Sequence, residues 1–177
     1  MSSRISLATV WLDGCSGCHM SFLDLDERLL ELGQRVDLVY SPLVDRKEYP
    51  EVVDVALVEG AVASDEDLAK VRLIRARTRT LVALGDCAVT GNVTSMRNPF
   101  GLDAVFARAY VEHATTQAQA PSRELPCLLE RVVPVHEAVR VDVVVPGCPP
   151  SADLIWLALN ELLAGRLPEL EGEVRFG

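Results

Sequence analysis

Three short apolar runs in this chain each end at a turn that carries glycine and cysteine, and this pattern constrains the fold most strongly. Residues 5–12 lead into Gly14-Cys15, residues 80–84 into Gly85-Asp86-Cys87, and residues 141–145 into Gly147-Cys148. Apolar runs of this length and composition are typical of strands buried in a parallel sheet. The carboxyl ends of such strands meet at one sheet edge, where open α/β proteins place their chemistry. We therefore expect the three turns to lie together.

The rest of the chain alternates between strand-like and helix-like patterns. Residues 36–40 and 52–58 predict two more strands, and the helical patterns cover residues 20–32, 64–77 and 151–163. Gly33 is the expected end of the first helix, and Ser64 the expected start of the second. This alternation predicts an α/β fold with a doubly wound parallel sheet of the flavodoxin-like type.

One segment does not follow this rhythm. Residues 92–140 contain four prolines and show poor periodicity, which predicts a long irregular insertion before the last strand. A chain of 177 residues is most simply one domain, so we expect residues 1–177 to form a single flavodoxin-like domain.

Composition narrows the class of protein. A formal net charge of −9 argues against nucleic acid as a partner, because that affinity comes from Lys and Arg on phosphates. No apolar run approaches the roughly 18 residues of a membrane span, and residues 1–12 lack the features of an export signal. A cytoplasmic location follows as an expectation, and thiols stay reduced there. Five cysteines, an odd number, also favour metal binding over a disulfide framework.

Four of these cysteines have spacings that fit one metal centre. Cys15 and Cys18 form a C-x-x-C pair after the first strand, and Cys87 and Cys148 follow two later strands. Thiolates at one edge predict an iron–sulfur cluster or a zinc site with four cysteine ligands. A thioredoxin-type redox pair would leave Cys87 and Cys148 unexplained. Cys127 follows neither a strand nor a glycine and is interpreted as a buried or incidental thiol.

Several polar or aromatic residues near these cysteines have two interpretations each. Asp13 and Asp86 either tune the potential of a bound cluster or serve as ordinary turn and cap residues. His19 is either a partner of a cluster sulfur or a partly exposed histidine at a helix start. Trp11 either stacks on a flavin or has a core or interface role. The polar residues at 92–98 either contact a partner or flavin phosphate, or form an ordinary loop.

Three segments of the chain resemble, in order, the motifs of nickel–iron hydrogenase small subunits. They are WLDGCSGCHMSF at 11–22, GDCA at 85–88 and PGCPP at 146–150. In that family the four matching cysteines bind one proximal 4Fe–4S cluster, which implies the ligand set Cys15, Cys18, Cys87 and Cys148. The nickel–iron site lies in a separate large subunit. The resemblance therefore implies an electron-transfer subunit with no catalytic residue of its own.

The chain resembles most the short small subunit of cytoplasmic bidirectional NAD(P)-linked hydrogenases, because it shows neither a twin-arginine signal nor a C-terminal domain with further clusters. That resemblance implies a large-subunit partner, diaphorase subunits with iron–sulfur clusters and flavin, and an FMN near this subunit. The related quinone-reductase subunit has adjacent cysteines where this chain has C-x-x-C. Small subunits of F420-reducing and sulfur-reducing hydrogenases are alternatives. So are a zinc-stabilised flavodoxin-like interaction module and a free-standing flavodoxin.

Overall fold

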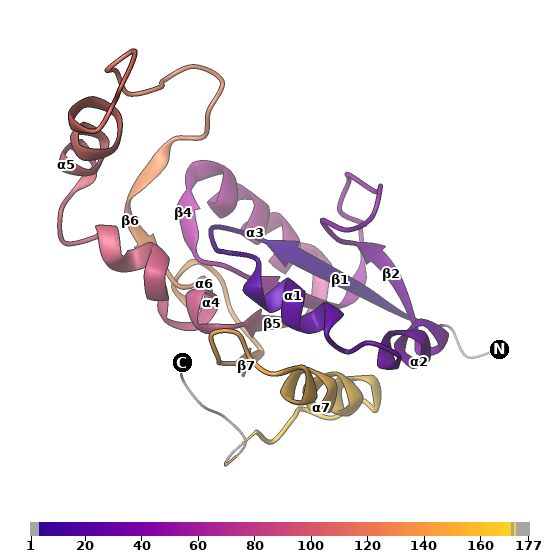
Figure 1. Ribbon diagram of the computed structural model, residues 1–177. Coiled ribbons are helices and arrows are strands. Elements are labelled where there is room, and N and C mark those ends of the chain that lie inside the picture. The colour runs from indigo at the N-terminus through magenta and orange to yellow at the C-terminus, as the bar shows by residue number, and fades with distance from the viewer. Residues whose placement is uncertain (1–3, 171, 173–177) are drawn as a thin grey trace.

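The computed structural model describes residues 4–170 and 172, and its centre is a five-stranded parallel sheet (Figure 1). Across the sheet the strands are β2 (Val36–Tyr40), β1 (Ile5–Trp11), β3 (Val53–Glu59), β5 (Thr78–Leu84) and β7 (Val143–Val145). Counted in chain order, this is the 2-1-3-4-5 arrangement of flavodoxin-like folds. The expected α/β class is confirmed. The expected span of 1–177 includes residues 1–3, 171 and 173–177, which lie outside the described part.

Helices cover both faces of this sheet. One face carries α1 (Gly17–Leu23), α2 (Arg28–Arg35) and α7 (Ala152–Leu163). The other carries α3 (Asp65–Arg77), α4 (Asp86–Thr90) and α6 (Val135–Ala138). Two layers of helices around a parallel sheet bury the strands on both sides, which explains why β3 is apolar almost throughout.

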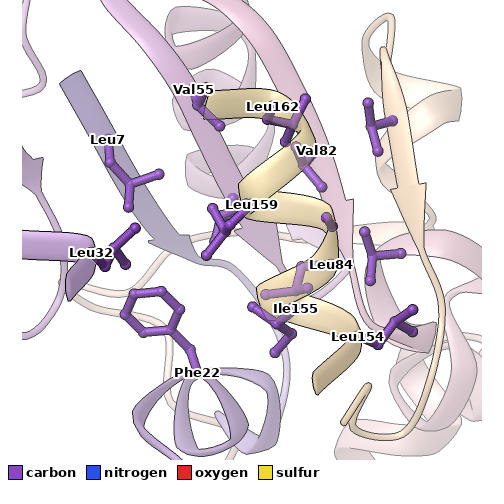
Figure 2. Packing of buried hydrophobic residues seen from close by; sticks show 14 of the residues in the cluster. Leu7, Phe22, Leu32, Val55, Val82, Leu84, Leu154, Ile155, Leu159 and Leu162 are labelled. Carbon is purple, nitrogen blue, oxygen red and sulfur yellow. The ribbon is translucent and has the colours of Figure 1, made fainter. Parts of the chain in front are cut away.

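Alternate strand residues supply the two halves of the core. On β1, Leu7 points toward α7 while Ala8 belongs to the opposite cluster, and on β3 Val55 and Ala56 divide in the same way. Figure 2 shows Leu7 and Val55 from the strands facing α7. Both sheet faces are therefore closed to ligands, and the carboxyl edge is left for chemistry.

The helix expected over residues 20–32 is wrong in one respect, because the structure divides it into α1 and α2. Asp26 takes a left-handed φ of 50°, and a turn of short-range hydrogen bonds replaces helix there. The break lets Phe22 and Leu32 reach the core from two directions (Figure 2). Gly33 does not end the helix either: α2 continues to Arg35 and passes directly into β2.

The segment at 92–140 is more regular than the sequence indicates. It contains the 3-10 helix η1 (Asn92–Arg97), α5 (Leu102–Phe106), the π-helix η2 (Ala107–Glu112), β6 (Leu128–Val133) and α6. Strand β6, which the sequence pattern did not predict, pairs antiparallel with the three-residue strand β4 (Val62–Ser64). Figure 1 shows α5 well away from the sheet, at the outer end of this segment.

The predicted start of α3 is confirmed at Ser64. Its hydroxyl accepts the N–H of Asp67 at 3.1 Å, and the Asp67 carboxylate accepts the Ser64 N–H in return. This reciprocal pair satisfies backbone donors that a helix leaves unpaired at its start. No helix in the described ranges is long and apolar enough to cross a membrane.

Candidate metal centre

The four predicted ligands line one small cavity at the carboxyl edge of the sheet. Cys15 and Cys18 come from the turn after β1, Cys87 from the turn after β5 and Cys148 from the turn after β7. The cavity has a volume of about 90 Å³. Cys15 and Cys148 are exposed, whereas Cys18 and Cys87 are partly buried. The cavity therefore has a closed inner side and an open outer side, with two sulfurs on each.

Helix starts fix the positions of these cysteines. Cys18 is the second residue of α1 and Cys87 the second of α4, so both lie inside helices rather than before them. Cys148 lies shortly before Ser151, whose hydroxyl caps α7 by accepting the N–H of Leu154. Three strand-to-helix connections thus carry the four thiols.

Hydrogen bonds join the turn of Cys87 to the turn of Cys148. The N–H of Gly85 donates to the carbonyl of Val145 at 2.7 Å, and the N–H of Asp86 to the carbonyl of Gly147 at 2.9 Å. The buried Asp86 carboxylate accepts the N–H of Gly147 at 2.6 Å. Of the two interpretations of Asp86, this geometry supports the turn and cap role. The two turns behave as one rigid unit.

Gly85 is required by the closeness of the Cys18 sulfur. A Cβ added at Gly85 would lie 2.2 Å from Cys18 Sγ, far inside van der Waals contact. The residue also has φ 83° and ψ 160°, a backbone conformation that is essentially restricted to glycine. The sulfur of Cys18 therefore occupies space that only a missing side chain leaves open.

Two of the sulfurs accept N–H groups. The N–H of Gly17 lies 3.4 Å from Cys15 Sγ, and the side-chain amide Nδ2 of Asn92 lies 3.4 Å from Cys148 Sγ. Such donors stabilise negative charge on sulfur and are typical of the surroundings of iron–sulfur clusters.

The environment disfavours free thiolates on the inner side of the cavity. Burial raises the pKa of Cys18 far above its usual value, and the charges of Glu59, Cys87 and Cys15 raise it further. Burial also raises the pKa of Cys87, with a further contribution from Cys148, against a lowering by the Val93 N–H. The four thiols can therefore lose their protons together only when a positively charged metal group binds between them and replaces those protons.

Glu59 is a residue at this site that the sequence pattern did not reveal. Its side chain at the end of β3 is almost fully buried, and its Oε2 accepts the backbone N–H of His19 at 2.8 Å. The Nδ1 of His19 lies 3.0 Å from the same oxygen, an ion-pair distance without hydrogen-bond angles. His19 is buried rather than partly exposed, which corrects that interpretation. The missed signal was an acidic residue that follows the apolar run 55–58 and ends its strand at the carboxyl edge of the sheet.

The other residues considered from the sequence lie around the cavity or away from it. Trp11 is about half exposed and donates its indole N–H to the carbonyl of Gly14 at 3.3 Å, so it is not a core residue. Burial, and then the charge of Asp67, raises the pKa of Asp13. Cys127 is exposed, does not line the cavity, and forms backbone hydrogen bonds to Asp65.

The donor set is chemically suited to an iron–sulfur cluster. Cysteine thiolates are the ligands of 4Fe–4S cores, and the four cysteines line one shared cavity. Two of the four sulfurs accept N–H groups, which stabilise negative charge on sulfur. A zinc ion with four cysteine ligands would use the same kind of donor.

The fold and the four cysteines at the sheet edge define an α/β oxidoreductase subunit of a known family. The chain belongs to the family described as NADH ubiquinone oxidoreductase, 20 kDa subunit, whose family model matches residues 15–162. Within that family it is similar to hydrogenase subunits. It is 41% identical to the delta subunit of the NAD-reducing hydrogenase HoxS of Cupriavidus necator, over 97% of this chain and 84% of the relative.

Archaeal relatives are longer. The chain is 35% identical to a subunit of the F420-non-reducing hydrogenase of Methanothermobacter thermautotrophicus, and the match covers 96% of this chain but only 57% of that relative. Among solved structures, a crystal structure of an NAD⁺-reducing NiFe-hydrogenase in the H2-reduced state matches with a TM-score of 0.94 and 41% identity. The match covers 99% of this chain and 100% of the solved one. The resemblance to hydrogenase small subunits is thereby confirmed.

Proposed function

We propose that this chain is the electron-transfer small subunit of a nickel–iron hydrogenase that reduces NAD(P). Cys15, Cys18, Cys87 and Cys148 hold one 4Fe–4S cluster in this proposal. The cluster supplies one-electron transfer between the hydrogen-splitting site of a large subunit and a diaphorase module. The chain itself contributes the thiolates, the N–H groups on them and a rigid frame.

The observation that carries the proposal is the shared cavity of the four cysteines. Three separate strand ends bring their sulfurs around about 90 Å³, and the space for Cys18 Sγ depends on the absence of a side chain at Gly85. Cysteines that serve only as buried free thiols would not need to share one cavity, so the shared cavity supports a common bound group. The cavity is also well below the 300–1,000 Å³ of ordinary small-molecule pockets, so it does not favour FMN at this position.

The open side of the cavity supports a protein partner. Cys15 and Cys148 are exposed there, and exposed apolar side chains stand on the same turns or next to them: Trp11, Met20, Val93 and Met96. Apolar side chains around a polar site are typical of the central part of a protein interface. We assign this face to the large subunit, which would exclude water from the outer sulfurs.

The choice of NAD(P) as acceptor rests on the relatives. The Cupriavidus necator relative is described as NAD-reducing and is more similar to this chain than the archaeal relative named above. An F420-linked complex is the second candidate, supported by 35% identity to the gamma subunit of the coenzyme F420 hydrogenase of Methanosarcina barkeri over 88% of this chain. A cytoplasmic location belongs to the NAD(P) proposal and is tested by cell fractionation.

The first experiment is purification of the chain with its native partners, followed by iron, sulfide, nickel and zinc analysis. We expect iron and sulfide, nickel in the large subunit, and an EPR signal on reduction. Serine replacement of Cys15, Cys18, Cys87 or Cys148 should each remove the same component of that signal, because a thiolate ligand of one cluster is lost. Replacement of Cys127 by serine is the matched control and should leave it intact.

Two results would contradict the proposal. One is zinc without iron in the purified chain, which would favour the zinc-stabilised interaction module. The other is an EPR spectrum that none of the four serine replacements changes. Hydrogen-dependent reduction assays with NAD, NADP and F420 in parallel then identify the acceptor.

A further inference from the structure

We infer that Asn92 sets the reduction potential of the cluster by donating its side-chain amide to the sulfur of Cys148. This inference rests on the proposed 4Fe–4S cluster and adds a residue that tunes it. The amide Nδ2 lies 3.4 Å from Cys148 Sγ, within hydrogen-bonding range for sulfur. Asn92 follows Cys87 closely in the chain, yet it contacts the ligand from the turn after β7.

The backbone conformation at Asn92 directs its side-chain amide toward Cys148 Sγ. Asn92 has a positive φ of 33°, directly after Gly91 with φ 84°. Asparagine tolerates positive φ far better than most residues. The Thr94 hydroxyl donates to the Gly91 carbonyl at 2.7 Å and the Ser95 hydroxyl to the Asn92 carbonyl at 2.9 Å. The turn is thus closed by its own side chains.

The following residues anchor this turn to a second sheet. The side-chain amide of Asn98 donates to the carbonyl of Val132 at 2.9 Å and accepts the Val132 N–H at 2.8 Å. Arg97 donates to the carbonyl of Leu129 at 2.7 Å. Both partners lie on β6, so η1 is anchored at its C-terminal end, while the bonds to the Gly91 and Asn92 carbonyls close its N-terminal end and limit the movement of Asn92.

The other side of the cavity differs from the side of Asn92. The buried Glu59 carboxylate lines the cavity there, and its Oε2 accepts the backbone N–H of His19, the residue after Cys18. An amide N–H at Cys148 and a carboxylate near Cys18 leave the negative charge of the four ligands unevenly stabilised.

The electrostatic consequence has a definite sign. One electron taken from the hydrogen-oxidising partner makes the ligand sulfurs more negative, and a hydrogen bond from a neutral N–H becomes stronger as its acceptor gains charge. The Asn92 amide therefore favours the reduced form and raises the potential. Covering by a large subunit would strengthen this effect, because hydrogen bonds act more strongly away from water.

The test is an EPR-monitored redox titration of the complete complex with two substitutions at this position. Asn92→Gly removes the donor and keeps the tolerance for positive φ. Asn92→Asp keeps the shape and replaces the donor by a carboxylate. Gln117→Gly is the matched control, because it removes an amide side chain at another position of positive φ, 50°, that does not line the cavity. The signal of this cluster is defined as the one that Cys148→Ser removes.

At the wild-type midpoint we expect the ratio of reduced to oxidised cluster to fall about threefold to tenfold in Asn92→Gly. This corresponds to a lowering of about 30–60 mV at about 59 mV per tenfold for one electron. The lowering should be larger in Asn92→Asp and absent in Gln117→Gly. These results would support a tuning role.

Other outcomes overturn the inference. An intact signal with an unchanged midpoint in both Asn92 variants would refute the tuning role and leave the proposed cluster standing. Loss of the cluster in Asn92→Gly would show a structural role instead. Absence of a 4Fe–4S signal in the wild-type complex would remove the proposed function and this inference together.

Discussion

Replacement of Gly85 by alanine should remove the cluster while costing the fold little more than a matched substitution elsewhere. The new Cβ would lie 2.2 Å from Cys18 Sγ, whereas ordinary contact begins near 3.4 Å. The sulfur must therefore move by more than about 1 Å, while metal–ligand distances hold to within about 0.2 Å. Because Sγ is the end of a rotatable side chain, the cluster-free protein can accommodate this movement.

The backbone cost of the same substitution can be measured separately. Gly101 has φ 73° and ψ 158°, nearly the conformation of Gly85, and a Cβ there would meet nothing within 4 Å. Alanine in this region costs roughly 1–3 kcal/mol. Gly85→Ala and Gly101→Ala should therefore lower the free energy of unfolding by similar amounts. Only Gly85→Ala should displace Cys18 Sγ and so impair cluster binding.

The assay compares both variants in the purified complex by iron content, EPR on reduction and thermal unfolding. Gly101→Ala should keep the full iron content, and Gly85→Ala should lose the four irons of one 4Fe–4S cluster together with the EPR component that Cys148→Ser also removes. If Gly85→Ala retained the iron content and EPR spectrum of Gly101→Ala, the close approach of Cys18 Sγ to Gly85 would not belong to the ligand geometry. The cavity would then lose its main support as a cluster site.

Three further substitutions test the frame that supports the site. Burial alone would raise the pKa of Asp142, but a backbone N–H from β5 and the Arg75 guanidinium, 2.5 Å away, lower it below its ordinary value of 3.8. Asp142→Asn should therefore lower the free energy of unfolding by roughly 1–3 kcal/mol at pH 7, and this difference from wild type should vanish as the pH falls through the lowered pKa of Asp142. Unfolding curves at several pH values measure the difference, and a difference that does not change with pH would contradict this reasoning. Ser64→Ala should lower the free energy of unfolding by about 0.5–2 kcal/mol through loss of the cap of α3, and an unchanged denaturation midpoint would count against that cap. Leu159→Ala should cost about 2–5 kcal/mol because Leu159 is fully buried between α7 and the sheet (Figure 2), and a much smaller cost in the same unfolding assay would mean that this core is loosely packed.

Local patterns predicted most of the sheet and the placement of the cysteines. The apolar runs before Cys15, Cys87 and Cys148 identified strands, and the meeting of parallel strand ends predicted that the cysteines would come together. Ser64 was recognised as a helix start because capping depends on residues only a few positions apart. These features need no knowledge of distant partners.

Errors arose where distant contacts override local preference. Residues 20–32 have helical spacing, but the core on the α7 side requires Phe22 and Leu32 to approach from different directions, so the helix breaks at Asp26. β6 went unrecognised because its pairing partner, β4, lies more than sixty residues earlier and is only three residues long. A strand of this kind is defined by its partner rather than by its own pattern.

Motif spacing and periodicity are local properties of the chain, and they were enough to establish the family, the sheet and the four thiols at its edge. The surroundings of those thiols depend instead on the folded arrangement. Gly85 faces Cys18 because strand ends lie side by side, and Asn92 reaches Cys148 because the turn after α4 is anchored to β6. Glu59 is buried beside His19 because the ends of neighbouring strands bring the two residues together. Such contacts join residues tens of positions apart, so their geometry exists only after the sheet has formed.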